Sequence, residues 1–230
     1  MESNQEVQIS ANLIISFADS YEQNKQRIEK EQSESESNSI PIFTQVTSSL
    51  QSLIVQIQNN NTSKSVIQIP KLLQSLSALA TFRIDTHLKQ EIDLQRIEVR
   101  HWSRQCLYII QYYGDEQVQS ELVRQGYGIV MSFSYCTAGG VGEEQDLGIQ
   151  NGLYRISDFL RELHEGRDDD WYPSFQPLPL LVPVSLEQIE DEGANEELDA
   201  QLNNKGDDGD IIYWANESKA ATLNHFIHIN

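Results

Sequence analysis

Cysteine is nearly absent from this sequence, and so is any apolar run long enough to cross a bilayer. The two cysteines, Cys106 and Cys136, are too few for a disulfide framework or for a four-thiolate zinc site. The apolar stretch 13–18 is far shorter than the roughly 20 residues of a membrane helix. Glu2 and Glu6 stand where a signal peptide carries positive charge. We therefore expect a cytoplasmic protein that has no membrane segment.

Positive charge is also scarce. The chain has 16 Lys and Arg residues against 35 Asp and Glu residues, a net charge of -19. This charge repels phosphate groups and anionic lipids, so we expect neither a nucleic acid nor a membrane surface as a partner. Segment 187–210 holds ten of the acidic residues and a single lysine. Leu186, Ile189, Leu198 and Leu202 indicate short helices in this region. Either it is a solvated face or loosely ordered extension that keeps the body soluble, or it attracts a basic segment of a partner protein, or it lies across a basic groove of its own body.

Alternating strand patterns followed by tight hairpin turns are missing, whereas helical periodicity is strong. Apolar residues recur at steps of three and four, as on one face of a helix. This spacing predicts helices over 40–57, 69–82, 99–113, 115–125, 149–163 and 218–229, and a weaker one over 7–28. Asp115 is placed to cap a helix, and Gly114 and Gly166 to end one.

Two segments lack helical character. Residues 31–39 contain no apolar side chain and are expected to form a linker. Four prolines between 173 and 183 exclude a regular helix, and Trp171, Tyr172 and Phe175 are too apolar to stay in solvent. We therefore expect an extended strap that lies on the helical body. The predicted domains are an N-terminal helix and linker (1–39), a helical domain (40–166), and a strap, acidic segment and C-terminal helix (167–230).

Several segments resemble a known family. The run DEQVQSELVRQGYGIVMSFSY from Asp115 is similar to the first two helices of an armadillo repeat, with Gly126 at their junction, and QNGLYRISDFLREL (150–163) is similar to the third. Upstream, IPKLLQSL (69–76) and residues 99–112 resemble the second and third helices of an earlier repeat. The resemblance implies an all-α fold, an armadillo-like α-solenoid in which helices form a right-handed stack.

The same resemblance implies a function. In that family the long third helices line a groove that receives a peptide or helix of a partner, so the chain is expected to be a non-enzymatic scaffold or adaptor. The implied partner-binding residues are Trp102, Arg104 and Arg155, which lie on the long helices. Ile109 and Arg155 stand where the family places the asparagines that hold a peptide backbone.

The sequence gives little support for an enzymatic function. Cys136 precedes two glycines and could be a nucleophile, but no histidine is placed beside it. The glycines at 126 and 128 begin a dinucleotide motif that Met131 interrupts, and the acidic turn 205–211 lacks the glutamate that completes a calcium loop. We expect no catalytic residue, no cofactor and no metal. A cysteine-dependent hydrolase or transferase that uses Cys136 is the alternative.

Overall fold

The computed structural model describes residues 2–28, 39–60, 62–81, 90–136, 146–191, 193–204 and 210–227, and over these ranges the protein is all-α. Eleven helices occupy the described chain, and the only pairing of extended residues there is an isolated bridge between Arg167 and Phe175. Contacts divide the chain into two compact units, residues 1–113 and 114–230. Each unit is described by itself below.

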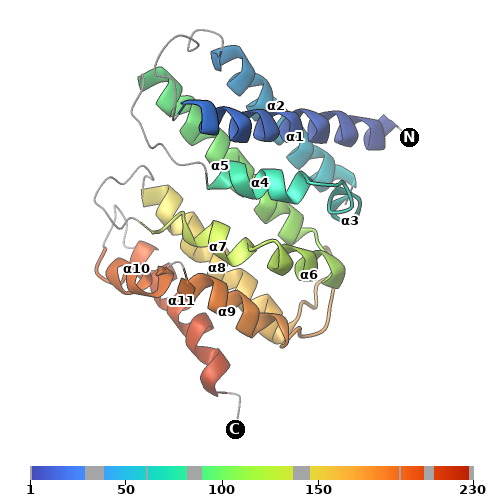
Figure 1. Cartoon of the computed structure of the whole chain (residues 1–230). Coiled ribbons are helices and arrows are strands. Elements are labelled where there is room, and N and C mark those ends of the chain that lie inside the picture. The colour runs from blue at the N-terminus through green and yellow to red at the C-terminus, as the bar shows by residue number, and fades with distance from the viewer. Residues whose placement is uncertain are drawn as a thin grey trace. The chain divides into compact units, whose positions relative to one another are not determined.

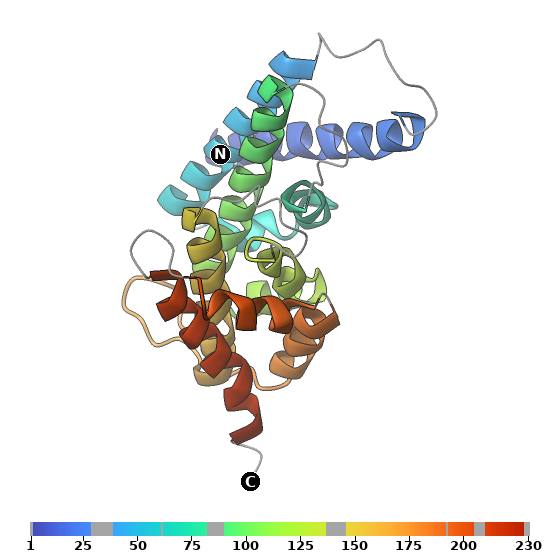
Figure 2. The same cartoon turned by 90° about the vertical axis from the view of Figure 1, so that its left-hand side faces the viewer.

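The described part of the first unit contains five helices, whose arrangement is shown in Figures 1 and 2. They are α1 (Glu2–Ile28), α2 (Ser39–Asn60), α3 (Ser63–Val66), α4 (Leu72–Ala80) and α5 (Gln90–Tyr112). The long helices α2 and α5 lie side by side, α4 packs on α5, and α1 packs on both α2 and α4. Figure 2 shows α2 and α5 along one side of the unit, with α1 leading away from them.

The helix faces of the first unit follow directly from the apolar spacing. In α1, the buried residues Val7, Ala11, Ile14 and Ala18 recur at steps of four, three and four. Polar contacts then tie the elements at the margin of this core: Gln56 Nε2 donates to Glu6 Oε2 at 2.5 Å, and Lys71 Nζ to Asp19 Oδ2 at 3.2 Å. The apolar stripes therefore supply most of the attraction, because exposed polar pairs contribute little.

The described part of the second unit contains six helices, which are shown in Figure 1. They are α6 (Glu116–Arg124), α7 (Tyr127–Ser132), α8 (Asp146–Glu165), α9 (Leu181–Asp191), α10 (Ala194–Gln201) and α11 (Asp210–Ile227). The two longest, α8 and α11, pack against each other, and α9 packs against both of them. Helix α7 contacts α8 and α9, and α10 contacts α9 and α11. The pair of helices α8 and α11 carries the candidate binding surface.

Small side chains let α11 approach α8 closely. The buried face of α11 carries Ile211, Ala215, Ser218 and Ala221, at steps of four, three and three. The hydroxyl of Ser218 donates to the Leu153 carbonyl at 2.8 Å, which satisfies a buried polar group across the contact. On α8, Gly152 is needed for a similar reason: a Cβ there would lie 1.7 Å from Ser134 Oγ. Packing therefore fixes these two helices relative to each other.

The sequence predicted the helical class correctly, and several helix ends with it. Asp115 caps α6 by accepting from the Val118 amide at 3.1 Å, as expected. Gly114 follows α5, and Gly166 follows α8 with φ +78°, a conformation that glycine adopts without strain. Gly126, with φ +77°, separates α6 from α7. These positions confirm the expected junctions.

Other expectations need correction. Helix α4 begins at Leu72 rather than at 69, because Lys71 adopts φ +66° and Pro70 lies in the preceding turn. The strap ends at residue 180, and Pro183 lies in the first turn of α9, where its missing N–H costs no hydrogen bond. In the described part of segment 187–210, α9 and α10 bury Ile189 and Leu198, so this part is helical and packed rather than loosely ordered.

The two units come from a division by contacts, which does not test the predicted domains. The division falls after residue 113, and the boundaries expected after residues 39 and 166 lie inside the units. The domains 1–39, 40–166 and 167–230 therefore stay a prediction. The expected linker at 31–39, the loop at 139–148 and the acidic turn at 205–211 lie largely outside the described residues.

Candidate protein-binding surface

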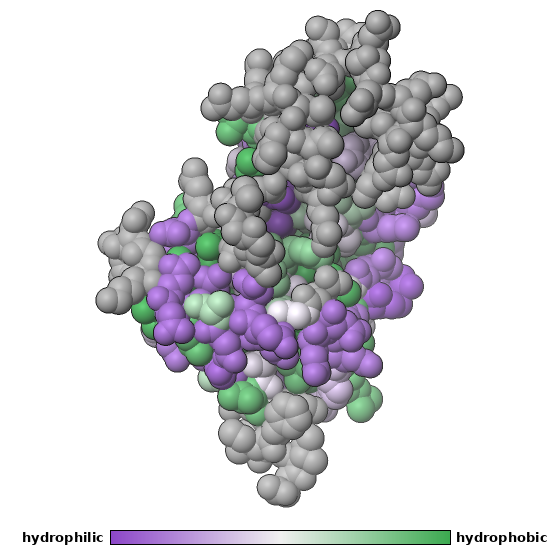
Figure 3. Space-filling view, turned by 60° about the vertical axis from the view of Figure 1, so that its left-hand side comes forward, coloured by the Kyte–Doolittle hydropathy of each residue, from purple (hydrophilic) through white to green (hydrophobic). Residues whose placement is uncertain are grey.

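Charge is distributed very unequally between the two units. Residues 114–230 hold 23 acidic and 6 basic residues, a net charge of −17, whereas residues 1–113 hold 12 and 10, a net charge of −2. Figure 3 faces the side of the second unit that carries α10 and α11, and it shows hydrophilic side chains over most of the described surface with smaller hydrophobic areas between them. Positively charged ligands are therefore drawn to the second unit.

Three aromatic side chains group where α8 and α11 meet. The rings of Tyr154 on α8 and Trp214 on α11 are 4.8 Å apart at 69°, and those of Tyr213 and Trp214 are 4.9 Å apart at 80°. Edge-to-face pairs of this kind hold aromatic rings in a fixed orientation. Tyr213 is nevertheless 56% exposed, so the group presents an aromatic surface to solvent.

The helices α8 and α11 run in the same direction beneath this group. Gln150 Nε2 donates to Asp210 Oδ2 at 3.1 Å, and the next contact along both helices is that of Tyr154 with Trp214. Each partner advances by four residues, about one helical turn, which requires parallel axes. A ligand that lies across α8 and α11 would thus contact both helices at the same level along their axes.

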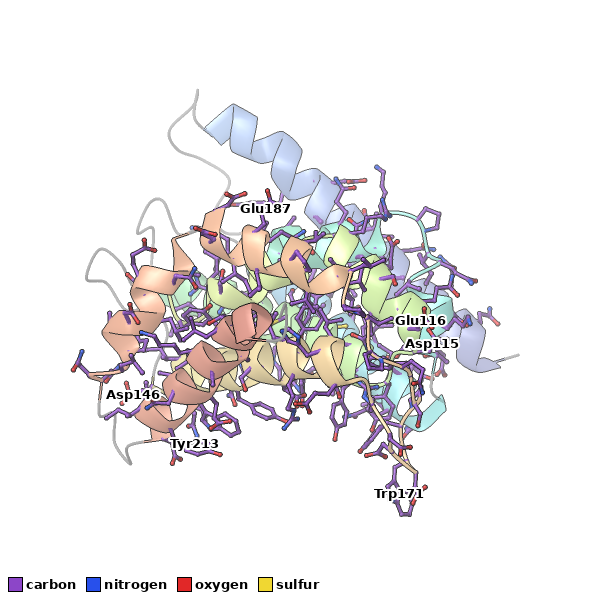
Figure 4. The ribbon with its side chains drawn as sticks, turned by 90° about the horizontal axis from the view of Figure 1, so that it is seen from below. Asp115, Glu116, Asp146, Trp171, Glu187 and Tyr213 are labelled. Carbon is purple, nitrogen blue, oxygen red and sulfur yellow. The ribbon has the colours of Figure 1, made fainter. Side chains whose placement is uncertain are left out.

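Carboxylates flank the exposed tyrosine on α11. Asp210 and Glu217 are exposed and stand three residues before and four after Tyr213, so all three side chains share one face of the helix. Figure 4 shows Tyr213 projecting from the ribbon on the side of the unit that also carries Asp146. We call Tyr154, Asp210, Tyr213, Trp214 and Glu217 the acidic-aromatic surface. Guanidinium and ammonium groups suit such a surface, since they stack on aromatic rings and pair with carboxylates.

A buried polar cluster lies next to α8 but is closed to solvent. Tyr127 and Asp158 are 1% and 5% exposed, and the Tyr127 ring packs on Phe159 at 4.6 Å. Burial raises the pKa of the Tyr127 hydroxyl, and burial together with the charge of Glu162 raises the pKa of Asp158. Such groups could move protons in an active site, but no substrate reaches side chains this deeply buried. The cluster is part of the core.

The residues that the sequence assigned to partner binding are not brought together at this surface. Trp102 lies half-buried on α5, with its ring 5.3 Å from that of His101. Arg104 is 5% exposed and its Nε donates to the Ala80 carbonyl at 3.1 Å, near the end of α4. Arg155 is 8% exposed, and its charge acts on the Tyr127 hydroxyl. Their binding role stays a prediction, although two of these side chains are packed inside.

The sequence interpretation missed Tyr213 and Trp214 because it began the last helix only at 218. A signal was available, since Ile211, Ala215 and Ser218 continue the helical spacing of that segment upstream. Asp210, the first residue of α11, was interpreted only as part of the acidic segment 187–210 and of the acidic turn 205–211.

The cysteines give no support to the alternative enzyme reading. Cys106 is fully buried, and burial raises its pKa, so its thiol is a small core side chain. Cys136 is half-buried, and residues 137–145, which follow it, lie outside the described chain. Catalysis by Cys136 therefore stays a prediction. No group of three or more potential metal ligands is found among the residues that the structure describes.

Comparisons with models of protein families, with curated proteins and with solved structures find no match to this chain. Within the described ranges, none of the helices is both long and apolar enough to cross a membrane.

Proposed function

We propose that this protein is a non-enzymatic scaffold that binds a basic segment of a partner protein on the acidic-aromatic surface. The observation that carries the proposal is the coincidence of exposed aromatic and acidic side chains on α11, in the unit that holds −17 of the total charge of -19. Basic side chains gain both stacking and ion pairing there. A neutral ligand would gain no ion pair there, and an anionic ligand would be repelled by the carboxylates.

We further propose that the helices form an armadillo-like array, as the sequence resemblance implies. Helix order supports this: the last nine helices form three successive sets, each with two short helices followed by a longer one. The sets are α3, α4 and α5, then α6, α7 and α8, then α9, α10 and α11, with closing helices of 23, 20 and 18 residues. In the second unit, the closing helices α8 and α11 are neighbours with parallel axes, as expected for repeats stacked in register.

The proposal is tested with the full-length chain as bait, at low and at high salt. We expect a partner that carries a run of Lys and Arg, and we expect its recovery to fall at high salt, because the Debye length shrinks from about 10 Å at 0.1 M to about 3 Å at 1 M. Tyr213→Ala removes the exposed ring and should weaken the complex about tenfold or more, the usual effect of truncating an aromatic anchor.

Ile9→Ala is the matched control, because Ile9 is a 61% exposed apolar residue on α1 in the nearly neutral unit. It should leave binding unchanged. If every recovered protein binds Tyr213→Ala as well as the unmodified chain, at either salt concentration, the acidic-aromatic surface is not the binding site and the proposal fails.

A further inference from the structure

Trp171 occupies a position that sequence reasoning did not anticipate. We expected Trp171, Tyr172 and Phe175 to pack on the helical body, and Phe175 does so, with 7% exposure. Trp171, in contrast, is 87% exposed, and Figure 4 shows it at the tip of the segment between α8 and α9, pointing away from the ribbon. An isolated indole in water is unusual, because Trp is largely buried in most folds.

The base of this loop is fastened tightly. Arg167 and Phe175 exchange two backbone hydrogen bonds, of 2.8 and 2.9 Å, and the Leu178 amide donates to the Leu163 carbonyl at 2.8 Å. Gly166 is required where α8 ends, since a Cβ there would lie 2.6 Å from the Phe175 carbonyl oxygen. Residues 167–175 therefore form a closed loop whose ends are held together on the second unit.

A buried arginine anchors the same base. The guanidinium of Arg167 donates to both carboxylate oxygens of Glu162, at 2.7 and 2.6 Å, and to the Gly114 carbonyl at 3.1 Å. It also lies over the Phe175 ring, 5.0 Å from the centroid. A bidentate pair of this kind is geometrically specific, so the loop has a defined direction relative to α8.

The tip of the 167–175 loop is held in place by the side chain of one of its own residues, Asp169. Asp169 Oδ1 accepts from the backbone amides of Trp171 and Tyr172, at 2.6 and 3.1 Å. The hydroxyl of Ser174 closes the loop by donating to the Asp169 carbonyl at 3.1 Å. The backbone that carries Trp171 is thus fixed before any ligand arrives, which removes part of the ordering cost of binding.

From this geometry we infer that the loop 168–172 is a second protein-binding element, which inserts Trp171 into an apolar pocket bordered by Lys or Arg on a partner protein. Trp is one of the side chains enriched among the few residues that dominate protein–protein binding. Asp168 and Asp170, beside it in sequence, are complementary to a basic rim. Anionic membranes, nucleic acids and a second copy of this chain are disfavoured by the same carboxylates and by the charge of −17 on the unit.

This element is separate from the acidic-aromatic surface. The two share no residue, and Trp171 and Tyr213 lie at opposite ends of the view in Figure 4. Either site can therefore be present without the other, and the substitutions that test them are different.

The test places a photoreactive phenylalanine analogue at position 171 of the full-length chain in cells, with the same analogue at position 180 as the control. Leu180 is 86% exposed and lies in the same segment between α8 and α9, so it is matched in both exposure and location. We expect a covalent adduct with one partner protein from position 171 that is absent from position 180. The cross-linked peptide should map to an apolar pocket with Lys or Arg at its edge.

Binding of the purified partner then tests the energetics. Trp171→Ala should weaken binding by about 10- to 100-fold, and Leu180→Ala should not change it. Asp168→Asn combined with Asp170→Asn should reduce both the affinity and its dependence on salt. Circular dichroism should show equal helix content and Tm for Trp171→Ala, because the indole is exposed.

Several results would overturn the inference. Equal labelling from positions 171 and 180, or an adduct only with a second copy of the chain, would show that the loop has no specific pocket to fill. So would a partner whose affinity Trp171→Ala leaves unchanged. Binding of the chain to anionic lipid vesicles that is lost in Trp171→Ala would replace the protein partner with a membrane.

Discussion

The two units use the same structural device and differ in what they show to solvent. Each places two helices of 18 to 23 residues side by side, α2 with α5 in residues 1–113 and α8 with α11 in residues 114–230. The other helices are shorter, except for α1, which has 27 residues and packs on α2 and α4. The first unit is nearly neutral, with a net charge of −2, and the second carries −17. Because both units pair long helices in this way, that pairing does not account for the difference in charge, which is instead the basis of the proposed binding surface on the second unit.

One ion pair in each unit shows a second difference, in how deeply the charged side chains are buried. In the second unit, Arg167 and Glu162 form a bidentate ion pair with side chains only 6% and 11% exposed. In the first unit, the ion pair of Lys71 with Asp19 joins side chains that are 61% and 49% exposed. A buried pair is costly to break and an exposed pair is not. Breaking the pair of Arg167 with Glu162 should therefore cost far more stability than breaking the pair of Lys71 with Asp19.

The largest expected effect comes from breaking the buried pair. Arg167→Ala removes the bidentate partner of Glu162 and the anchor of the 167–175 loop, and should lower the free energy of unfolding by about 3–5 kcal/mol. Thermal unfolding followed by circular dichroism should show Tm reduced by about 10 °C. Lys71→Ala in the first unit is the control and should lower Tm by no more than about 2 °C. Equal losses from both variants would remove the contrast between the units.

A smaller effect is expected from crowding α8. Gly152→Ala places a methyl group where Ser134 Oγ now lies, and overpacking of this kind costs about 1–3 kcal/mol. Combining it with Ser134→Gly, which removes the opposing side chain, should recover part of the loss. A double-mutant cycle from urea unfolding measures that coupling. Additive effects of the two substitutions would mean that the α8 backbone relaxes, and that packing in the second unit is less strict than described.

Sequence reasoning captured the helices because their signal is local. The steps of three and four in Val46, Leu50 and Leu53 need no knowledge of the rest of the chain, and neither does the cap at Asp115. It gave only weak indications of the helices beyond residue 180, because the buried apolar residues of a helix such as α10 are just Ala194 and Leu198, among many acidic residues. In such segments the acidic composition suggests disorder. The few apolar residues are buried by a neighbouring helix, and that contact is not visible in the sequence.

The candidate site was harder to predict for a different reason. Arg104 and Arg155 are charged, so sequence patterns place them at a surface, but long side chains can reach buried acceptors such as the Ala80 carbonyl. Trp171 is the reverse case: its apolar character predicted burial, yet the loop that holds it is closed by Asp169 and directs the indole outward. Exposure of single side chains depends on tertiary contacts that periodicity does not encode.

A pH-dependent effect should separate the second unit from the first. Burial, reinforced by the charge of Glu162, raises the pKa of Asp158 above its ordinary value of 3.8. The folded state therefore binds this proton more readily than the unfolded state, so ionisation of Asp158 costs no stability below pH 3.8 and its full penalty applies once the pH exceeds the raised pKa. Asp158→Asn removes that penalty and should raise Tm by about 2–4 °C at pH 7, with a smaller gain at pH 4.

The control for this pH effect is Asp199→Asn, at a carboxylate that is 61% exposed and paired with Lys219. It should change Tm little at either pH, because an exposed pair contributes little to stability. If Asp158→Asn lowers Tm at pH 7 instead, the contact of Asp158 with Arg161 outweighs the cost of burying the carboxylate.

The smallest expected effect is the response of each unit to salt. Like charges repel within the second unit, and added salt screens that repulsion over distances of about 10 Å at 0.1 M. Raising the NaCl concentration should therefore slow amide hydrogen exchange in α8 and α11 by a few-fold and leave α2 and α5 nearly unchanged. Sodium sulfate would strengthen apolar burial in both units, so NaCl is the suitable salt. An equal response of the two helix pairs would show that the charge difference does not strain the fold, and selective slowing in α8 and α11 would show that the acidic surface is kept at a cost in stability.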